Sequence, residues 1–354
     1  MKILNITTLS SNYDIVIDKG LFENLGSEIK KIYNNTKIAV VTDSNLYDIY
    51  GQSLNDLLVK NNFIPNFIVV KPGETSKSLI TLEYVYTKLA TLNITRSDLI
   101  IAFGGGVVGD LAGFAASTYL RGINYIQVPT SLLAQIDSSI GGKVAINLKE
   151  GKNLAGSFYH PIKVLIDPDF LLSLPEKYLR DGLGELIKYA CIKDPILFQT
   201  LMNIKSNTQL FNNMEQIIYT CCSIKKNLVE IDEKDTGPRM LLNFGHTIGH
   251  AIEKYMNYEI THGEAISAGM LFITHNSEKL CITETGTCDK IKNILDHFNI
   301  VYNLPDLNSK VLTDYIYLDK KNMSGEINFV LLKQIGEAFI HKVPLIEAKK
   351  FISL

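Results

Sequence analysis

Side chains able to bind anions, carry protons or hold a metal recur at helical spacing in one short stretch. Arg239, Asn243, His246 and His250 stand at positions i, i+4, i+7 and i+11, and His262 follows twelve residues after the last. On a helix of 3.6 residues per turn this spacing predicts one stripe of side chains. His246 and His250 could both bind one metal, although a single helical histidine is more often structural. The stretch therefore predicts a polar site on a helical scaffold.

A carboxylate that could join these imidazoles lies upstream, in a Gly-Leu-Gly-Glu-Leu-Ile-Lys motif. Its Glu185 and Lys188 are three residues apart on one expected helix face. A surface ion pair is the ordinary interpretation, but the flanking glycines and apolar neighbours favour a buried pair. One carboxylate and two imidazoles form a frequent catalytic zinc set with positions open for substrate. Glu185 with His246 and His262 could form such a set, and the pair of His246 and His250 stays open as an alternative.

A glycine-rich turn follows the predicted buried strand 98–103. Residues 104–109, Gly-Gly-Gly-Val-Val-Gly, match the G-x-G-x-x-G pattern, whose glycines let backbone N–H groups approach a pyrophosphate at a helix N-terminus. A tight strand-to-helix turn is the alternative. In the common dinucleotide-binding fold the motif follows the first strand, with an acidic residue downstream, whereas here Asp43 and Glu74 precede it. The pattern predicts dinucleotide binding on a variant sheet.

Lysines placed after glycine turns predict a phosphate site. Pro129-Thr130-Ser131 leads to Asp137 and then to Gly-Gly-Lys143, and Gly151-Lys152-Asn153 adds a second lysine. A compact ammonium beside exposed N–H donors suits phosphate. For a single lysine a solvated surface loop is the better interpretation. For two lysines beside Asp137 we favour anion binding.

Two further lysine pairs are ambiguous. Lys225 and Lys226 are typical of a solvated helix face, unless one of them turns inward because Arg239 lies nearby in the sequence. Lys320 and Lys321, between an aspartate and an asparagine, could form an ordinary turn or contribute to a site.

The elements that must position these residues begin with alternating strands and helices. A hairpin or two edge strands at 4–8 and 13–17 precede predicted strands at 37–42, 66–70, 98–103, 125–128 and 164–167, with helices at 21–32, 46–61 and 79–92. This order gives a mostly parallel sheet with helices on both faces. Ligands bind beyond the carboxyl ends of such strands. The polar or flexible residues found at those ends are Asp43, Glu74, Lys77, Gly105 and Thr130.

The second half of the chain is dominated by long helical patterns. They cover 178–192, 196–204, 214–232, 241–256 and 262–279, and a small hairpin is expected near 327–336. Pro168 discourages a continuous element at the change of pattern. We therefore predict a Rossmann-like α/β domain that binds the dinucleotide at 1–168, and a mainly α-helical metal- and substrate-binding domain at 169–354.

Composition sets the broad class. The 354 residues allow two domains, and the net charge of −2 gives no sign of a nucleic-acid or membrane partner. No apolar run reaches bilayer length, and residues 1–18 alternate like a strand and lack the features of a signal peptide, so a cytoplasmic location is expected. The five cysteines lack a framework spacing, which agrees. We expect the adjacent Cys221 and Cys222 to be buried small residues.

Taken together, these motifs resemble the 3-dehydroquinate synthase family of sugar phosphate cyclases. The matching segments are 104–110, 129–143, 151–153, 184–188, 239–250, the His-Gly-Glu-Ala at 262–265 and the Asp-Lys-Lys at 319–321. They follow the family's order and span most of the chain, from Asp43 to about Val330. No single segment is specific, but the combination is. Ser131 stands where many members have a second threonine, which keeps the hydroxyl.

The resemblance implies a dehydroquinate synthase-like fold and three sets of site residues. It implies zinc or cobalt bound by Glu185, His246 and His262. It implies NAD contacts from Asp43, Asn45, Glu74, Lys77, Gly105, Gly106, Val107, Asp110, Thr130, Ser131, Asp137, Lys143, Lys152, Phe170 and Ser173. It implies substrate contacts from Asp137, Lys143, Asn153, Lys188, Lys225, Arg239, Asn243, His250 and Lys320, with Lys321 open as the alternative to Lys320. Arg121 resembles an arginine that the family lends to a neighbouring subunit's site, which implies a homodimer.

The resemblance also implies a reaction. The family converts 3-deoxy-D-arabino-heptulosonate 7-phosphate into 3-dehydroquinate and phosphate, a step of the shikimate pathway to aromatic amino acids. The expected steps are transient oxidation at C5 by NAD, β-elimination of phosphate, re-reduction, and intramolecular aldol closure. Arg239 and Lys225 suit the substrate carboxylate, and His250 suits proton transfer near the leaving phosphate.

Two other activities share this machinery. Another sugar phosphate cyclase, making an inosose or a valiolone, would use the same cofactors, but Lys225, Arg239 and Asn243 favour a substrate with a carboxylate. A metal- and NAD-dependent polyol dehydrogenase would release NADH. A nucleotide-binding scaffold without activity would not need the candidate metal ligands or the anion-binding lysines described above.

Overall fold

The computed structural model describes residues 1–304, 315 and 325–352 of the chain. By their internal contacts, two compact units form: Met1–Leu174 with Met214–Lys234, and Pro175–Asn213 with Asp235–Leu354. The sequence predicted one boundary, after residue 168. The difference arises in α7 (Asn207–Ile231), most of which is grouped with the first unit. An amphipathic pattern shows that one helix face is buried, but not which unit buries it.

The first unit is built on a seven-stranded sheet with the order β1-β2-β9-β6-β5-β3-β4. Its strands are β1 (Lys2–Thr7), β2 (Asn12–Ile17), β3 (Lys37–Asp43), β4 (Ile64–Val70), β5 (Leu99–Gly104), β6 (Tyr125–Pro129) and β9 (Lys163–Ile166). β1 and β2 pair antiparallel, and every other pairing in the sheet is parallel. The predicted mostly parallel sheet with an edge hairpin is therefore confirmed.

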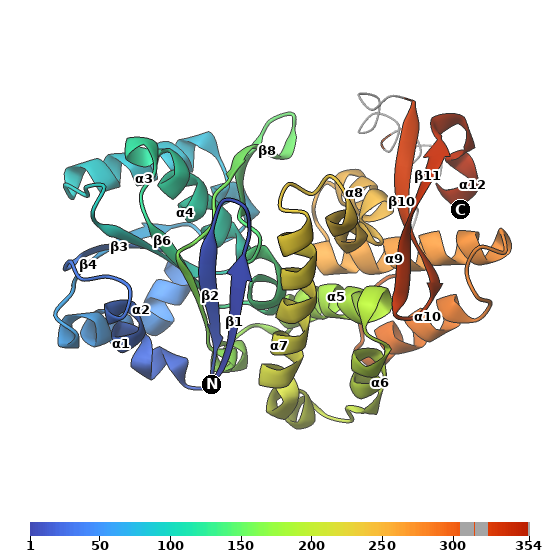
Figure 1. Ribbon diagram of the computed structural model, residues 1–354, viewed down its shortest axis with the longest axis horizontal. Helices are drawn as coiled ribbons and strands as arrows, with labels where there is room; N and C mark the ends of the chain where they lie inside the picture. The colour runs from blue at the N-terminus through green and yellow to red at the C-terminus, as the bar shows by residue number, and fades with distance from the viewer. Residues whose placement is uncertain (305–314, 316–324, 353–354) are drawn as a thin grey trace. The chain divides into compact units, whose positions relative to one another are not determined.

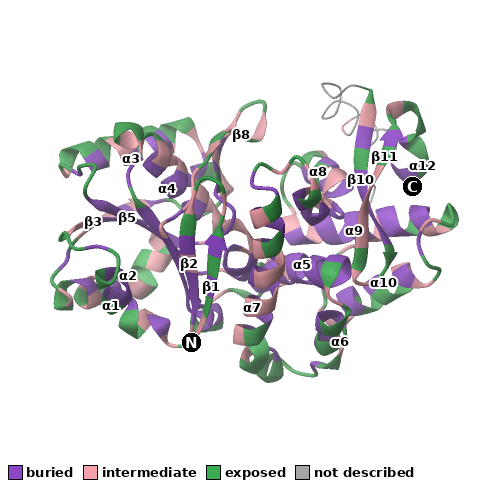
Figure 2. Ribbon diagram, viewed as in Figure 1, coloured by how far each residue is buried: buried purple, intermediate pink, exposed green. Residues whose placement is uncertain are grey.

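Helices cover both faces of this sheet (Figure 1). They are α1 (Leu25–Lys30), α2 (Ser44–Lys60), α3 (Leu79–Thr91) and α4 (Gly106–Thr118). Because side chains alternate along a strand, β3 contributes to two cores. Ile38 and Val40 pack with α1 and α2, whereas Ala39 and Val41 pack with α3 and α4. Burial on both faces explains the continuous apolar runs of the central strands, which are drawn as buried in Figure 2.

Short helical turns and a second hairpin complete the first unit. The turns are η1 (Leu21–Asn24), η2 (Glu74–Ser76), η3 (Tyr119–Arg121), η4 (Ala134–Ser138) and η5 (Pro168–Leu172). The hairpin pairs β7 (Lys143–Leu148) antiparallel with β8 (Gly151–Phe158). The sequence indicated only glycine-rich lysine loops in this region, because the hairpin's polar and glycine residues hide the strand alternation.

The second unit is mainly helical. Its helices are α5 (Glu176–Lys193), α6 (Pro195–Asn203), α8 (His246–Tyr255), α9 (His262–Lys279), α10 (Thr287–His297) and α12 (Lys349–Ile352), with short turns η6 (Pro238–Asn243) and η7 (Leu345–Glu347). The predicted C-terminal hairpin is confirmed as β10 (Glu326–Gln334) and β11 (Glu337–Pro344), whereas α10 was not predicted. α5 and α9 are buried along most of their length (Figure 2). No described helix is long and apolar enough to cross a membrane.

One predicted element was wrong. The stretch from Arg239 to His250 is not a single helix, because Gly245 adopts a left-handed conformation with φ of 77°. Arg239 and Asn243 lie in the short turn η6, and only His246 and His250 share α8. The prediction that these side chains share one helix face is therefore correct for His246 and His250 and wrong for Arg239 and Asn243, because Gly245 ends the preceding turn.

Candidate functional site

Two glycines let the helices that carry the candidate ligands approach closely. A Cβ atom added to Gly184 of α5 would lie 2.6 Å from the carbonyl oxygen of Gly263. A Cβ atom added to Gly263 of α9 would lie 2.0 Å from the carbonyl oxygen of Asp181. Any larger residue would force the two backbones apart. Since Glu185 and His262 are the immediate neighbours of these glycines, the close approach sets the two side chains beside each other.

Glu185, His246 and His262 converge on one point. The Nε2 atoms of His246 and His262 each lie 3.5 Å from Oε1 of Glu185. Ligand atoms about 2.0–2.1 Å from a tetrahedral zinc ion are separated by roughly 3.3 Å. The two separations from Glu185 are therefore close to those around a zinc ion, and all three residues offer donor atoms that a divalent ion accepts.

His250 lies beside this cluster and offers a different set of ligands. One ligand atom each from His246, His250 and His262 lie within 4.8 Å of one another. The His250 ring meets His246 edge-on, with centroids 5.3 Å apart, and stacks on His262 at 5.9 Å. The structure thus brings all four side chains together. The set with Glu185 fits a dication better, because two of its separations are 3.5 Å and its carboxylate adds negative charge.

The two candidate imidazole ligands have different protonation equilibria. Nδ1 of His246 lies 3.1 Å from the carbonyl oxygen of Phe244, and burial lowers the pKa of His246 to about 3. Burial would also lower the pKa of His262. There, hydrogen bonding to the carboxylates of Glu185 and Glu253 outweighs burial and raises the pKa to about 10. His246 thus faces a neutral acceptor, whereas His262 faces two carboxylates, which favour its protonated form when no ion is bound.

Two buried cations lie in the same unit. Lys188, which is 1% exposed, pairs with Oε2 of Glu185, the oxygen that does not face the histidines. The predicted buried pair between Glu185 and Lys188 is therefore present. Arg239 is 2% exposed. Because a buried charge is costly without a partner, both cations belong to a polar interior rather than to the surface.

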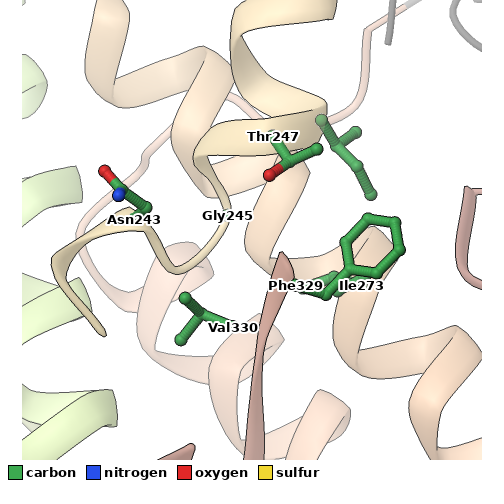
Figure 3. Close-up of a pocket in the computed structure, with 7 residues that line it drawn as sticks. Asn243, Gly245, Thr247, Ile273, Phe329 and Val330 are labelled. Atoms are coloured by element: carbon green, nitrogen blue, oxygen red, sulfur yellow. The ribbon is translucent and has the colours of Figure 1, made fainter. Parts of the chain in front are cut away.

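Asn243 lines a small pocket beside the start of α8. Asn243 and Thr247 bring polar side chains to it (Figure 3). Apolar side chains from α9 and β10 complete the wall, namely Ile273, Phe329 and Val330. The predicted Lys320 and its alternative Lys321 lie outside the described residues.

In the first unit, predicted cofactor residues follow the carboxyl ends of four parallel strands. Asp43 ends β3, and its carboxylate accepts a hydrogen bond from the Leu46 N–H at 3.2 Å, so it caps α2 at the turn that holds Asn45. Glu74 follows β4, Gly105 follows β5, and Thr130 follows β6. This is the edge at which parallel sheets bind ligands.

The glycine-rich motif forms a turn between β5 and α4. Gly105 is the N-cap of α4, and Gly106 and Val107 lie in the first turn, where backbone N–H groups lack helical partners. A Cβ atom on Gly105 would lie 3.3 Å from Oγ of Ser131. A Cβ atom on Gly109 would lie 2.7 Å from Gln127 of β6, so this glycine permits close packing of helix on strand.

Lys77 is the centre of a polar network. Its Nζ donates to Oδ2 of Asp110 at 2.6 Å and also to Oδ1 of Asn153. Asn147, which the sequence did not single out, joins this network through both ends of its amide. It donates to Oε1 of Glu74 at 2.7 Å and accepts from the Asn153 N–H at 2.9 Å. The network joins predicted NAD residues to the predicted substrate residue Asn153.

The hydrogen-bond partners of Lys225 and Lys226 on α7 show which of the two lysines turns inward. Lys225 is 5% exposed, and its Nζ donates to Oδ1 of Asp137 at 2.9 Å and to the Asp137 carbonyl oxygen at 2.7 Å. Lys226 pairs instead with Glu230, one turn along α7. Lys225 is therefore the member that turns inward. Lys143 is exposed at the start of β7, and Lys152 is half-buried in β8.

Three predicted residues have distinctive surroundings. Phe170 is 4% exposed and packs against Phe22, Tyr50 and Phe103, so its ring serves the core. Ser173, just beyond η5, exchanges a 2.8 Å hydrogen bond with the Tyr50 hydroxyl. Arg121 is exposed and has a left-handed φ of 67°, a conformation that costs about 1–2 kcal/mol for a residue with a Cβ.

Sequence reasoning missed two carboxylates around His262. Asp181 accepts a 2.6 Å hydrogen bond from the Gly263 N–H, and Glu253 lies 3.4 Å from Nδ1 of His262. Glu253 stands seven residues after His246, which places both on one face of a helix. That spacing was a usable signal for Glu253. No local pattern connects Asp181 with Gly263.

Solved structures with the same fold define the class. The fold matches 2-deoxy-scyllo-inosose synthase, solved with carbaglucose 6-phosphate, NAD⁺ and Co²⁺, with a TM-score of 0.86 and 25% identity over 100% of both chains. It also matches 2-epi-5-epi-valiolone synthase from Streptomyces hygroscopicus, solved with NAD⁺ and Zn²⁺, with a TM-score of 0.87 and 24% identity over 99% of this chain and 97% of that one. The chain thus has the fold of the sugar phosphate cyclases.

Sequence relatives narrow the class to a family. The 3-dehydroquinate synthase N-terminal family matches residues 67–181, and its C-terminal counterpart matches residues 182–322. The 3-dehydroquinate synthase of Clostridium acetobutylicum is 50% identical over 99% of both chains. The Enterococcus faecalis enzyme is 42% identical over 99% of this chain and 98% of its own length. This chain belongs to the 3-dehydroquinate synthase family.

Proposed function

We propose that this protein converts 3-deoxy-D-arabino-heptulosonate 7-phosphate into 3-dehydroquinate and phosphate, using NAD and a divalent zinc or cobalt ion. The observation that carries the proposal is the convergence of Glu185, His246 and His262, in a chain that belongs to the 3-dehydroquinate synthase family. NAD⁺ with Co²⁺ or Zn²⁺ in the two solved relatives supports the cofactor assignment.

The chain's own residues fit both cofactors. Glu185, His246 and His262 would hold the ion, and Gly105 and Gly106 at the start of α4 would receive the NAD pyrophosphate. When bound, the ion would lower the pKa of a substrate hydroxyl, and NAD would take up the hydride from the carbon that carries this hydroxyl and later return it. Asp43, which caps α2, and Lys77 with Asp110 would fix other parts of the dinucleotide at the strand ends.

The substrate's two anionic groups have matching side chains. Arg239, a planar guanidinium held in a buried position, suits the carboxylate. Lys143 and Asn153 suit the phosphate, since both are exposed and they bring a cation and an amide to the same hairpin. Lys225 paired with Asp137 offers a charged donor that is already oriented.

His250 would move protons during loss of phosphate. It is exposed, and its ring lies beside the candidate ligands His246 and His262. Histidine is the side chain best suited both to donate and to accept a proton near neutrality. This role requires His250 to stay off the metal.

We further propose that the enzyme acts as a homodimer in which Arg121 reaches the site of the neighbouring subunit. The supporting observation is local. Leu120 and Arg121 are consecutive left-handed residues, with φ of 51° and 67°, and the Leu120 carbonyl oxygen is fixed by Arg96 Nε at 2.9 Å. Strain of this kind is kept where it serves a function, and here it presents an exposed guanidinium.

One assay tests the reaction. The purified protein with NAD should release phosphate from the heptulosonate phosphate, should lose activity on chelation, and should regain it with Zn²⁺ or Co²⁺. NADH absorbance should not grow, because the cofactor is returned to its oxidised state. Steady NADH accumulation would identify a dehydrogenase. Turnover of glucose 6-phosphate or sedoheptulose 7-phosphate, with none of the heptulosonate phosphate, would identify one of the other cyclases.

A further inference from the structure

The candidate ligand His262 is held from both of its ring nitrogens. Nε2 faces Oε1 of Glu185 at 3.5 Å, and Nδ1 faces Oε2 of Glu253 at 3.4 Å. The backbone next to it is fixed as well, because the Gly263 N–H donates to Asp181 at 2.6 Å. The ring therefore has a defined direction, with one nitrogen assigned to each carboxylate.

The contact between Glu253 and His262 joins two different helices. Glu253 lies on α8, the helix that also carries His246 and His250, whereas His262 begins α9. The Glu253 side chain is only 4% exposed, and burying a carboxylate is costly unless a donor or a cation offsets the cost. The imidazole of His262 is such a partner.

The other candidate imidazole provides an internal comparison. Nδ1 of His246 faces a neutral acceptor, the carbonyl oxygen of Phe244, at 3.1 Å, while its Nε2 faces Glu185. Both rings therefore offer Nε2 to the same point and are steered through Nδ1. His262 differs because its Nδ1 partner is charged. A carboxylate on Nδ1–H fixes the tautomer and makes Nε2 a stronger donor to a metal.

We propose that Glu253 is a positioning residue that orients His262 and strengthens it as a metal ligand. This inference rests on the proposed function, and it adds Glu253 to the proposed metal site as a residue outside the three ligands. It predicts that Glu253 sets the affinity for the ion without touching the ion or the substrate. Loss of an outer carboxylate of this kind lowers metal affinity by about 10–100-fold.

The test is the Zn²⁺ dissociation constant of the full-length protein, measured by competition with a chromophoric chelator. E253A should bind Zn²⁺ about 10–100-fold more weakly than wild type. E253Q should lose less, because its amide oxygen still accepts from Nδ1–H. E259A is the matched control, since Glu259 is exposed and lies shortly after α8. The visible spectrum of bound Co²⁺ should change in both Glu253 variants and stay as in wild type in E259A.

The outcomes separate this inference from the proposed function. If wild type binds Zn²⁺ tightly and E253A and E253Q both match E259A in affinity and Co²⁺ spectrum, the inference is overturned and the proposed function stands. If wild type binds no divalent ion, both are overturned. Circular dichroism and thermal unfolding check the fold. If E253A does not fold, E253Q, which has the same size as the native residue, decides the question.

Discussion

At the residue scale, the three neighbouring histidines His246, His250 and His262 are proposed to have two different roles. His246 and His262 each place Nε2 at 3.5 Å from Glu185 Oε1. His250 is the exposed member, and its ring contacts both His246 and His262. The contacts with Glu185 therefore favour His246 and His262 as the two ligating imidazoles, and proton transfer is the role proposed for His250.

Substitution of His250 should separate chemistry from metal binding. We expect His250→Ala to lower kcat by about 10²–10⁴-fold, the usual contribution of a general acid or base, while the protein keeps one equivalent of zinc. Metal content by atomic emission and steady-state phosphate release measure the two effects. Glu185→Gln and His262→Ala serve as contrasts and should lose both metal and activity. Stoichiometric zinc missing from His250→Ala would show that His250 is a ligand.

At the element scale, the site depends on how closely α5 and α9 approach each other. That distance is set by Gly184 and Gly263, which leave no room for a Cβ atom. In the first unit, a buried ion pair joins α1 to β9. Glu28 accepts from Lys163 at 3.0 Å, and both side chains are buried.

A single methyl group should open the contact between α5 and α9. In Gly263→Ala the new Cβ would meet the Asp181 carbonyl oxygen at 2.0 Å, so α9 must shift and carry His262 away from Glu185. We expect a loss of about 1–3 kcal/mol in stability, as is usual for overpacking, together with weakened zinc binding. Thermal unfolding and chelator competition measure these changes. Gly151→Ala, in the other unit and near only a flexible Leu154 side chain, should bind zinc as wild type does.

The pair between Glu28 and Lys163 should make stability depend on pH. Burial would raise the pKa of Glu28, but the hydrogen bonds from Lys31 and Lys163 outweigh burial and lower the pKa. A lowered folded pKa means that the stabilisation is present above the unfolded value of about 4.3 and is lost as pH falls through the folded value.

Removing the Glu28 charge should reveal this dependence. We expect Glu28→Gln to cost about 3 kcal/mol at pH 7, because it leaves a buried lysine without its charged partner. Below about pH 4 the difference from wild type should narrow, since protonation then removes the same charge from the native protein. Denaturant unfolding across the pH range measures the difference. An equal difference at pH 7 and pH 3 would contradict the assignment.

At the scale of the whole molecule, the predicted site residues are divided between the two units. Asp43, Lys77, Asp137, Lys143, Asn153 and Lys225 belong to the first, and Glu185, Lys188, Arg239, Asn243, His246, His250 and His262 belong to the second. The proposed activity requires both sets. The proposed homodimer adds Arg121 from a neighbouring chain.

Mixing two inactive variants tests whether Arg121 acts on its neighbour. If it does, Arg121→Ala and His250→Ala should each be inactive as homodimers. Random exchange of an equal mixture should restore about a quarter of wild-type activity, because half of the dimers are mixed and each has one intact site. Phosphate release before and after subunit exchange measures this. A mixture that stays inactive, although size-exclusion chromatography shows dimers, would mean that Arg121 acts within its own chain.

Much of the architecture could be predicted from local pattern. Period-two and period-3.6 hydrophobicity located the sheet strands and placed α9 at its observed bounds, 262–279. Such patterns fail where a single residue changes the backbone, as Gly245 does between Asn243 and His246. They also fail in the hairpin of β7 and β8, whose glycines and polar residues interrupt the alternation.

By itself, the sequence determined which side chains are available for chemistry and the order in which they come. It did so because residue types limit ligand and proton chemistry, and because short-range spacing follows helix and strand geometry. Only the tertiary structure decided that Lys225 rather than Lys226 turns inward, and that Glu253 contacts Nδ1 of His262. These pairings join residues far apart in the chain or on different helices. Packing of complete elements fixes such contacts, and no local spacing encodes them.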